Sequence, residues 1–414
     1  MTHACDIAII GAGAAGIGAA RRLAGRGFSV VVLEALPRLG GRAWTATTRG
    51  LSLDLGCGWL HSADRNPWAR IAEAAGCVVD RRPSAWDRQF GDLGATPADW
   101  EAAGAAFDAW SRRLAEEPPA SDRAFDAVER GERWLAYLQA LSGYISGDEL
   151  ERISAADYAA YDRASTFLNW RLPAGYGTLV TSSFPADVAL HLATPVERLE
   201  VNGPAIELVT RRGTLRCRAA IITVSTDVLA GTAIRWPAAL DPWREAAAHL
   251  PLGCNEKLFL EIVGPSLFEA ETHVHGDLHD PASGTYYIRP FGFPVIECFL
   301  GGAGARRVLE EGTDAAFAHA TDQLAALFGA DVRRALRPAL ASAWGATPEI
   351  GGGYSHALPG NRSARPRLAV PYEDRLFFAG EATHPTDFST AHGALLSGIR
   401  AADQAAEAFS RERQ

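Results

Sequence analysis

The sequence has 414 residues, of which 48% are apolar and 21% charged, and its formal net charge is -9. A chain of this length exceeds one ordinary core and predicts two domains. Residues 84–170 carry 16 acids and 8 arginines, so nucleic acid is not an expected partner. This acidic excess either attracts a cationic substrate or is a solvated helical face. No window of 18 residues is uninterruptedly apolar, so we expect neither a membrane span nor a signal peptide.

The cysteines are scattered along the chain without the C-x-x-C spacing of zinc or redox sites. Such a pattern is typical of small core residues in a protein of a reducing compartment. We therefore expect a cytoplasmic protein without a metal site, whose cysteines are Cys5, Cys57, Cys77, Cys217, Cys254 and Cys298.

The stretch from Asp6 to Glu34 has the pattern of a strand, a glycine turn, a helix and a second strand. Its G-x-G-x-x-G motif lets the backbone approach a pyrophosphate at the N-terminus of a helix expected at 14–26, before a strand at 28–33. Glu34 follows the last glycine by 18 residues, near the spacing of an acid that binds ribose hydroxyls. The stretch predicts a site for FAD or NAD, with Gly11, Gly13, Ala14, Ala15, Gly16 and Glu34 at the cofactor.

A second glycine motif, Gly40-Gly41-Arg42, follows this acid. It resembles the segment that continues the nucleotide site in FAD enzymes of the glutathione-reductase type, where the arginine meets the flavin's phosphates. On physical grounds alone, Arg42 is equally compatible with a surface charge on a glycine turn. The resemblance favours FAD over NAD and implies an α/β fold with a Rossmann-type FAD-binding domain.

Beyond this unit the chain leaves the nucleotide domain and re-enters it twice. Residues 84–164 show apolar side chains at helical spacing. Further strands are expected at 195–201, 206–210, 215–224, 257–263, 285–289, 295–300 and 375–379, and further helices at 313–328 and from 392. The predicted FAD-binding domain comprises residues 1–75, 172–240 and 345–414, and the predicted substrate-binding domain comprises residues 76–171 and 241–344.

Two segments near the C-terminus, 377–383 and 389–398, resemble the signature of the flavin-containing amine oxidases. The sequence Gly58-Trp59-Leu60-His61, followed by Asn66-Pro67, is most similar to the polyamine oxidase branch of that family. The resemblance implies an interleaved α+β substrate-binding domain. It also implies flavin contacts at Gly56, Gly58, Trp59, Val196, Gly380, Glu381, Thr390 and Ala391.

Lys257 is the only lysine in the chain, against 39 arginines, and it lies in an otherwise apolar predicted strand. Burial would favour a neutral, proton-exchanging amine at this position. The family resemblance implies that this lysine holds a water against flavin N5. The alternative is a lysine at the surface.

The other candidate catalytic residues also come from the resemblance. Tyr354 corresponds to one wall of an aromatic cage before the flavin, and Trp344 is expected to guide the amine. Thr390 stands where monoamine oxidases have a second tyrosine, which predicts a wider site. Gly353 replaces the cysteine that bonds to the flavin in those enzymes, so FAD is expected to be held without a covalent bond. His61 either binds the distal part of a substrate or is a structural histidine.

The predicted reaction is oxidation of a primary or secondary amine, including polyamines, by hydride transfer to flavin N5. Imine hydrolysis and reduction of O2 to H2O2 complete it. A small amine and O2 are therefore the expected partners. The nearest alternative is an L-amino acid oxidase, which usually carries an arginine where Trp59 and Leu60 stand here. A flavin-dependent desaturase or mutase, or a flavoprotein without turnover, is disfavoured by Lys257 and Tyr354.

Overall fold

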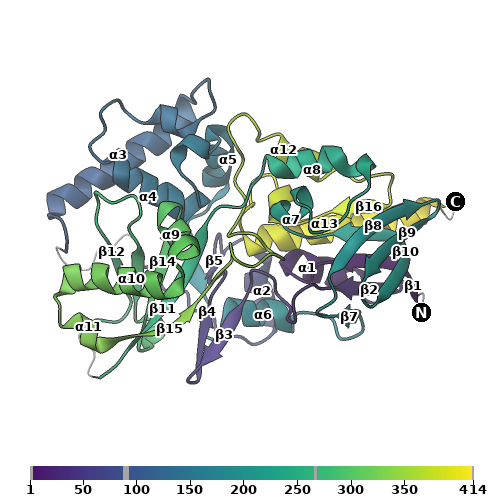
Figure 1. Ribbon diagram of the computed structural model, residues 1–414, viewed down its shortest axis with the longest axis horizontal. Coiled ribbons are helices and arrows are strands. Elements are labelled where there is room, and N and C mark those ends of the chain that lie inside the picture. The colour runs from purple at the N-terminus through teal and green to yellow at the C-terminus, as the bar shows by residue number, and fades with distance from the viewer. Residues whose placement is uncertain (1–2, 87–92, 265–267, 413–414) are drawn as a thin grey trace.

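The computed structural model describes residues 3–86, 93–264 and 268–412. Figure 1 shows an elongated molecule, with one sheet and the two chain ends on its right and a second sheet with several helices on its left. Part of the acid-rich stretch, residues 87–92, lies outside the described residues. Among the helices of the described segments, none combines the length and the apolar character needed to cross a membrane.

The first sheet has seven strands in the order β7-β2-β1-β10-β9-β8, with β16 also paired to β10. Its central strands are apolar throughout because both faces are covered. In β1, Ile7 and Ile9 pack in the core cluster shared with α1 and α13, whereas Ala8 and Ile10 pack in the cluster shared with α8 and α12. The strands are β1 His3–Ile10, β2 Val30–Leu33, β7 Ala189–His191, β8 Val196–Asn202, β9 Ala205–Thr210, β10 Gly213–Ile222 and β16 Leu376–Phe378.

Five strands of this sheet, β1, β2, β7, β10 and β16, run parallel, while β8 and β9 join the edge in antiparallel fashion. The parallel strands come from three separate segments of the chain, which brings the first and last segments together. The predicted Rossmann-type α/β fold is thereby confirmed. The domain boundaries given above remain a prediction.

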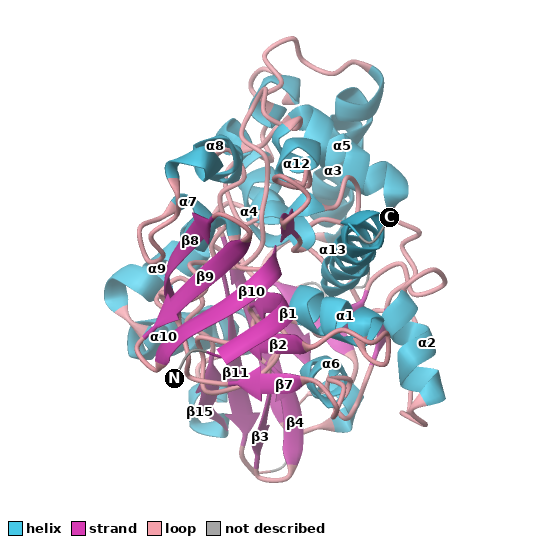
Figure 2. Ribbon diagram, turned by 90° about the vertical axis from the view of Figure 1, so that its right-hand side faces the viewer, coloured by secondary structure: helices cyan, strands magenta, loops and turns pink. Residues whose placement is uncertain are grey.

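Helices α1 (Ala14–Leu23) and α13 (Ala391–Glu412) lie on the same side of this sheet, as Figure 2 shows. They approach closely because glycines line the contact: a Cβ on Gly398 would stand 2.0 Å from the Ala15 carbonyl oxygen. The helix predicted over 14–26 ends at 23, before Gly25 and Gly27 with positive φ. The strand predicted from 28 starts at 30.

The second sheet is antiparallel, in the order β12-β13-β14-β11-β15. Alternate residues of β11 face opposite sides. Leu258 and Leu260 pack in the core cluster that includes α9 and α10, whereas Phe259 packs on the other side with residues of β4. The strands are β11 Asn255–Ile262, β12 Thr272–His275, β13 Thr285–Ile288, β14 Val295–Gly301 and β15 Leu336–Ala341.

Most predicted elements are present, and several short ones were missed. The region 84–164 is helical in its described part, as expected. The elements that the sequence analysis did not predict include α2, α7, α8, α9, α11, α12, β3, β6, β7, β12 and β15. The remaining helices are α2 Pro67–Ala74, α3 Pro97–Glu116, α4 Leu135–Ser146, α5 Ala155–Ala164, α6 Tyr176–Ser182, α7 Thr226–Ala230, α8 Asp241–Ala248, α9 Ala303–Glu311, α10 Thr313–Phe328, α11 Val332–Ala335 and α12 Ala364–Leu368. A short hairpin pairs β3 Thr45–Thr48 with β4 Leu51–Asp54, and a second two-stranded antiparallel sheet pairs β5 Trp59–Leu60 with the distant β6 Trp170–Arg171.

Candidate active site

The turn between β1 and α1 has no room for side chains. A Cβ on Gly11, whose φ is +104°, would stand 2.6 Å from the Thr223 hydroxyl, and one on Gly16 would stand 2.0 Å from the Gly11 carbonyl. Gly13 caps α1 without a side chain. The first N–H groups of α1 therefore have no side-chain partner at the cap and can serve an anion.

Glu34 is buried at the end of β2, next to this turn. Its carboxylate accepts the Ala12 N–H at 2.6 Å and the Leu36 N–H at 2.8 Å. Burial raises its pKa despite these bonds. The Glu34 carbonyl accepts the Thr194 N–H at 2.8 Å, which brings Val196, at the start of β8, near the same edge.

The second glycine motif lies against the first. The Gly40 N–H donates to the Ala12 carbonyl at 2.9 Å, and a Cβ on Gly41 would stand 3.3 Å from the Gly13 Cα. Arg42 donates to the Gly353 carbonyl at 2.6 Å and forms an ion pair with Glu381 at 3.0 Å. Arg42 is therefore not a free surface charge, and its role at the flavin's phosphates stays a prediction.

Glu381 connects this motif to the C-terminal segment. Its buried carboxylate accepts the Ser355 hydroxyl at 2.7 Å and the Ser389 N–H at 2.8 Å. Burial by itself raises the pKa of Glu381, but the charges of Arg42 and Arg365, together with the hydrogen bonds, lower it overall. The carboxylate is therefore ionised at neutral pH. A small cavity lies beside it, with Arg42, Val224, Ser225, Gly380 and Glu381 among its lining residues.

The start of α13 is held by hydrogen bonds of its own. The Thr390 hydroxyl accepts the Gly393 N–H at 3.0 Å and donates to the Asp387 carbonyl at 2.6 Å. The Ala391 carbonyl accepts the Trp68 indole N–H at 3.0 Å. The Thr390 side chain thus caps the helix, whether or not it also contacts a ligand.

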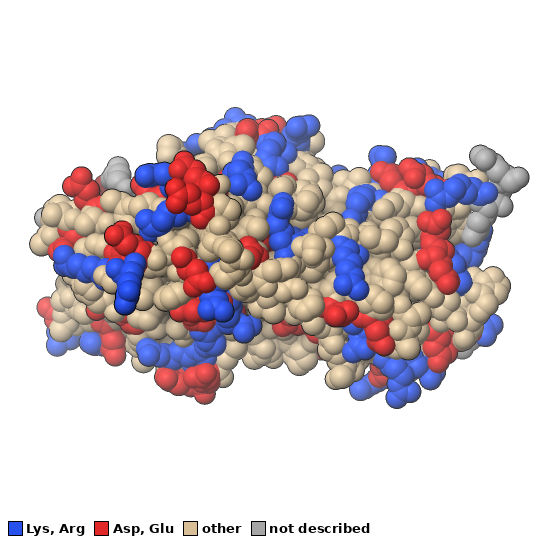
Figure 3. Space-filling model, turned by 90° about the horizontal axis from the view of Figure 1, so that it is seen from above, with Lys and Arg blue, Asp and Glu red and all other residues tan. Residues whose placement is uncertain are grey.

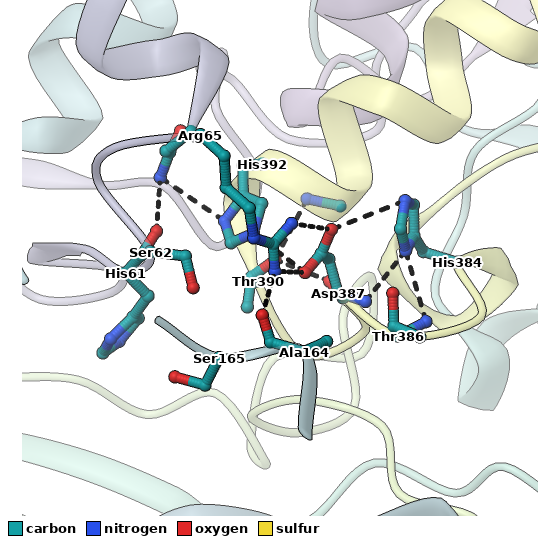
Figure 4. Close-up of polar contacts among 12 residues, drawn as sticks. His61, Ser62, Arg65, Ala164, Ser165, His384, Thr386, Asp387, Thr390 and His392 are labelled. Carbon is teal, nitrogen blue, oxygen red and sulfur yellow. Dashed lines mark hydrogen bonds and ion pairs between the residues drawn. The ribbon is translucent and has the colours of Figure 1, made fainter. Parts of the chain in front are cut away.

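A charged cluster that the sequence analysis missed surrounds Asp387 (Figure 4). Arg65 binds both carboxylate oxygens, at 2.8 and 2.5 Å, while His392 and His384 approach to 3.4 and 3.7 Å. The Asp387 N–H donates to His384 Nδ1 at 2.8 Å, so Nε2 carries the proton and faces the carboxylate. Because Arg65 also donates to the Ala164 carbonyl at 2.8 Å, the cluster joins the end of α5 to the start of α13.

Lys257, in β11, is buried where the second sheet meets residues 54–58. Its Nζ donates to the Asp54 carbonyl at 3.2 Å, and a Cβ on Gly58 would stand 3.1 Å from it. Nζ also forms an ion pair with Glu297 at 2.7 Å. The alternative, a Lys257 side chain at the protein surface, is therefore wrong. The expectation of a neutral amine took no account of this carboxylate.

Trp344 lies against the same residues 54–58, and Tyr354 lies in the segment that contacts Arg42. The Trp344 indole donates to the Leu55 carbonyl at 3.2 Å, and a Cβ on Gly56 would stand 3.3 Å from its ring and 1.7 Å from the Arg42 carbonyl. Tyr354 follows Gly353, which binds Arg42. The Tyr354 hydroxyl donates to the Tyr144 carbonyl, and burial raises its pKa far above neutrality. Tyr354 is therefore a neutral ring.

His61 and Trp59 belong to an aromatic cluster. His61 Nδ1 lies 2.8 Å from the Asn169 amide oxygen, and the imidazole stacks on Trp86 at 6.0 Å. Burial lowers the pKa of His61 to about 4, so the ring is neutral at pH 7. The centroids of the Trp59 and Trp86 rings lie 4.3 Å apart, and the Arg171 guanidinium carbon lies 4.8 Å from the centroid of the Trp59 ring. Both interpretations of His61 therefore stay open.

Comparison with known proteins identifies the family. Residues 80–406 match the family model described as flavin containing amine oxidoreductase, and residues 9–75 match an NAD(P)-binding Rossmann-like domain. The chain belongs to the flavin containing amine oxidoreductases. This amine oxidoreductase is 28% identical to Polyamine oxidase 2 of Arabidopsis thaliana, over 97% of this chain and 88% of the relative. It is 27% identical to Polyamine oxidase 4 of Oryza sativa subsp. japonica, over 96% of this chain and 88% of the relative.

A solved structure shares the fold. Putrescine oxidase, in its wild-type form bound to putrescine, superimposes with a TM-score of 0.77 at 18% identity, over 99% of this chain and 100% of that one. At this identity the likeness concerns the arrangement of the chain. It agrees with the predicted pairing of a Rossmann-type domain with a second, interleaved α+β part.

The cofactor of this amine oxidoreductase is FAD, and the residues present fit it. The tight turn at Gly11 and Gly16 and the uncapped start of α1 suit a pyrophosphate. The cavity beside Arg42 and Glu381 lies at the ends of β10 and β16, with Ile222 and Phe378 among its lining residues. Which of these residues touches the flavin itself stays a prediction.

Proposed function

We propose that this amine oxidoreductase oxidises a small primary or secondary amine and reduces O2 to H2O2. For a primary amine, one amine, one O2 and one water give an aldehyde, ammonia and H2O2. One observation carries the proposal: the only lysine of the chain lies buried where the second sheet meets residues 54–58. Three candidate residues come from distant segments: Lys257 contacts Asp54, Trp344 contacts Leu55, and Tyr354 follows Gly353, which contacts Arg42.

Bound FAD supplies the hydride acceptor for this reaction. The chain's own residues bind and orient the amine and exclude water. Tyr354, Trp59 and the neutral His61 offer uncharged aromatic surfaces, which suit an amine in its neutral, reactive form and a cationic amine through its approach to the rings. The similarity to polyamine oxidases supports a di- or polyamine as the substrate.

Oxidation of L-amino acids is the main alternative. Arg171 lies opposite Trp59 in the antiparallel pair of β5 and β6, which is where a clamp for a substrate carboxylate would be useful. Its guanidinium is already paired with Asp80 at 2.8 Å and Glu271 at 2.7 Å. These two acids oppose the approach of another carboxylate, so the contacts favour amines.

The test is a peroxide assay with mono-, di- and polyamines and with L-amino acids under air. We expect peroxide with at least one amine and a higher kcat/KM for that amine than for any amino acid. An L-amino acid with the highest kcat/KM would contradict amine specificity. Absence of peroxide with every amine, together with no bleaching of the flavin under anaerobic conditions, would favour a desaturase, a mutase or a protein without turnover.

A further inference from the structure

The face of the second sheet that points away from α9 and α10 carries an ion pair at its centre. In the β11–β14 register, Lys257 stands opposite Phe299 and Glu297 stands opposite Phe259. Lys257 and Glu297 are therefore diagonal neighbours on one face, a position from which long side chains meet. Their charged atoms lie 2.7 Å apart.

Both side chains are largely removed from solvent, with 9% of Lys257 and 19% of Glu297 exposed. An ion pair screened from water in this way is stronger than one at the surface, and removing one partner leaves the other poorly solvated. The contact therefore constrains the position of Nζ. It was invisible in the sequence, because 40 residues separate the two side chains.

The other titratable groups around Lys257 do not replace this carboxylate. The Asp54 carboxylate accepts the Thr45 hydroxyl and the Tyr176 and Gly177 N–H groups, and burial raises its pKa. Burial also raises the pKa of the Cys57 thiol and keeps His61 neutral. Among the described residues, Glu297 is the carboxylate in contact with Nζ.

We propose that Glu297 is a positioning residue, which keeps Lys257 in the ammonium form and fixes the direction of its N–H bonds. An ammonium has three donors and a neutral amine has two. Glu297 and the Asp54 carbonyl take two of them. The third is then free to donate to a water or to the oxygen that is reduced, whereas a neutral amine with both N–H bonds engaged would offer only its lone pair.

This inference rests on the proposed function for its kinetic consequence. During the reduction of O2, two electrons from reduced FAD and two protons produce H2O2, and negative charge develops on oxygen. A fixed ammonium stabilises that charge, an effect that typically contributes about two to three orders of magnitude per positioned group. Glu297 acts on the reaction through Lys257 and not by contact with the substrate.

The first test uses the fact that the chain has one lysine. Protein labelled with ¹³C-lysine gives a single side-chain NMR signal, whose Cε shift reports whether the amine is charged. In the FAD-loaded parent we expect the ammonium signal throughout about pH 6 to 9, where an unburied lysine is also charged. In Glu297→Gln we expect a neutral form to appear within that range, because the buried amine has lost its anion.

The matched control is Glu261→Gln. Glu261 lies on the same strand face as Lys257, is 19% exposed like Glu297, and pairs with Arg49 instead. The Glu261→Gln substitution should leave the lysine signal unchanged. If Glu297→Gln shows the parental signal at every pH, the proposal is overturned, and this readout requires no substrate, so it is independent of the proposed function.

The second test is stopped-flow kinetics of the two half-reactions. We expect Glu297→Gln to slow reoxidation of the flavin by O2 about tenfold or more and to change anaerobic reduction by the amine less than about threefold. Equal slowing of both half-reactions would show a general structural defect and would overturn the positioning role. If Glu297→Gln does not fold, Glu297→Asp is the second variant. It keeps the charge on a shorter side chain, farther from Lys257 Nζ, and should give an intermediate effect in both tests. A parental result for that variant would equally refute the proposal.

Discussion

Removing the Lys257 amine has two separable effects, because Nζ contacts both the Glu297 carboxylate and the Asp54 carbonyl. We expect Lys257→Met to slow flavin reoxidation by about one to three orders of magnitude, since one positioned electrostatic group is lost. Anaerobic bleaching by the amine should change less. The variant should also unfold at a lower temperature, because Glu297 keeps its charge without a partner.

The double variant Lys257→Met with Glu297→Gln separates these effects. Replacing both members of a buried pair is far less costly than removing one. The thermal midpoint should therefore recover toward the parental value while reoxidation stays slow. Recovery of the rate together with the midpoint would mean that Lys257 acts only through stability. Stopped-flow reoxidation and calorimetry on the same samples measure the two quantities.

The Asp387 cluster should make stability depend on pH at the acid end. Burial by itself raises the pKa of Asp387, but Arg65 and His392 lower it by more. The folded pKa therefore lies below the usual value of about 3.9. Such a group stabilises the fold above its unfolded pKa, and the contribution is lost as pH falls through the folded pKa. We expect Asp387→Asn to lower the thermal midpoint by about 2 to 6 °C at pH 7 and by progressively less below about pH 4.

Asp403→Asn is the control for that measurement. Asp403 lies in α13, the helix that follows Asp387, and binds two arginines, Arg22 and Arg26, but it is one-third exposed. Water screens such pairs, so its effect should be smaller than that of Asp387→Asn. A larger effect at Asp403 would contradict the importance given to burial around Asp387.

At the scale of elements, the contact between α1 and α13 depends on the absence of side chains. A Cβ on Gly398 would stand 2.0 Å from the backbone oxygen of Ala15, so Gly398→Ala must push the helices apart. We expect a loss of about 1 to 3 kcal/mol in unfolding free energy and weaker FAD binding, because α1 also opens the nucleotide turn. Denaturation and titration of apoprotein with FAD measure the two effects.

Gly104→Ala tests the specificity of that result. Gly104 is also inside a helix, α3, and a Cβ added to it would have no neighbour within 4 Å. Alanine there should stabilise the protein by up to about 1 kcal/mol, as helix propensity predicts. If both substitutions had the same sign, packing against α1 would not be the determining factor at Gly398.

The elements with strong local patterns could be read from the sequence. β1, α1, β11, α10 and α13 combine apolar periodicity with clear ends. β12 was missed because its THVH sequence is short and polar, and β15 because it contains Pro338, which strands tolerate at an edge such as this one. Helices of four to nine residues were missed because they show too few turns for a periodicity.

The residues of the candidate site also divide into those that the sequence indicates and those that only the structure reveals. Motif residues such as Gly11, Arg42 and Lys257 could be named from spacing and resemblance. Glu297 and Asp387 could not, because their importance arises from strand register and from the folding of α13 against the Arg65 loop. These partners are side chains that only tertiary structure brings within reach.

At the scale of the whole molecule, FAD should be bound without a covalent link. Gly353 offers no thiol, and even a Cβ there would stand 2.7 Å from the Asn255 amide oxygen. Acid precipitation of the yellow protein should leave the flavin in the supernatant. A yellow pellet would show a bond to another residue, and the absorbance of both fractions decides the outcome.

The charge distribution predicts weak electrostatic steering. On the face shown in Figure 3, acidic and basic side chains alternate. Several acids of the acid-rich stretch are paired, as in Arg133 with Asp99 and Arg152 with Asp148. The solvated helical face is thus favoured over an attractive field. We expect kcat/KM for a cationic amine to change less than about threefold between about 50 and 300 mM salt, whereas a fall of about tenfold or more would indicate steering.

The order in which the chain is synthesised matters for a sheet assembled from distant segments. β1 and α1 leave the ribosome first, but β16 and α13, which complete the sheet and cover α1, follow more than 350 residues later. Until then the alanine-rich side of α1 and the apolar edge of β10 have no native cover. We therefore expect a nascent chain of this protein to depend on chaperones through most of its translation, and loss of α13 to leave this surface exposed permanently.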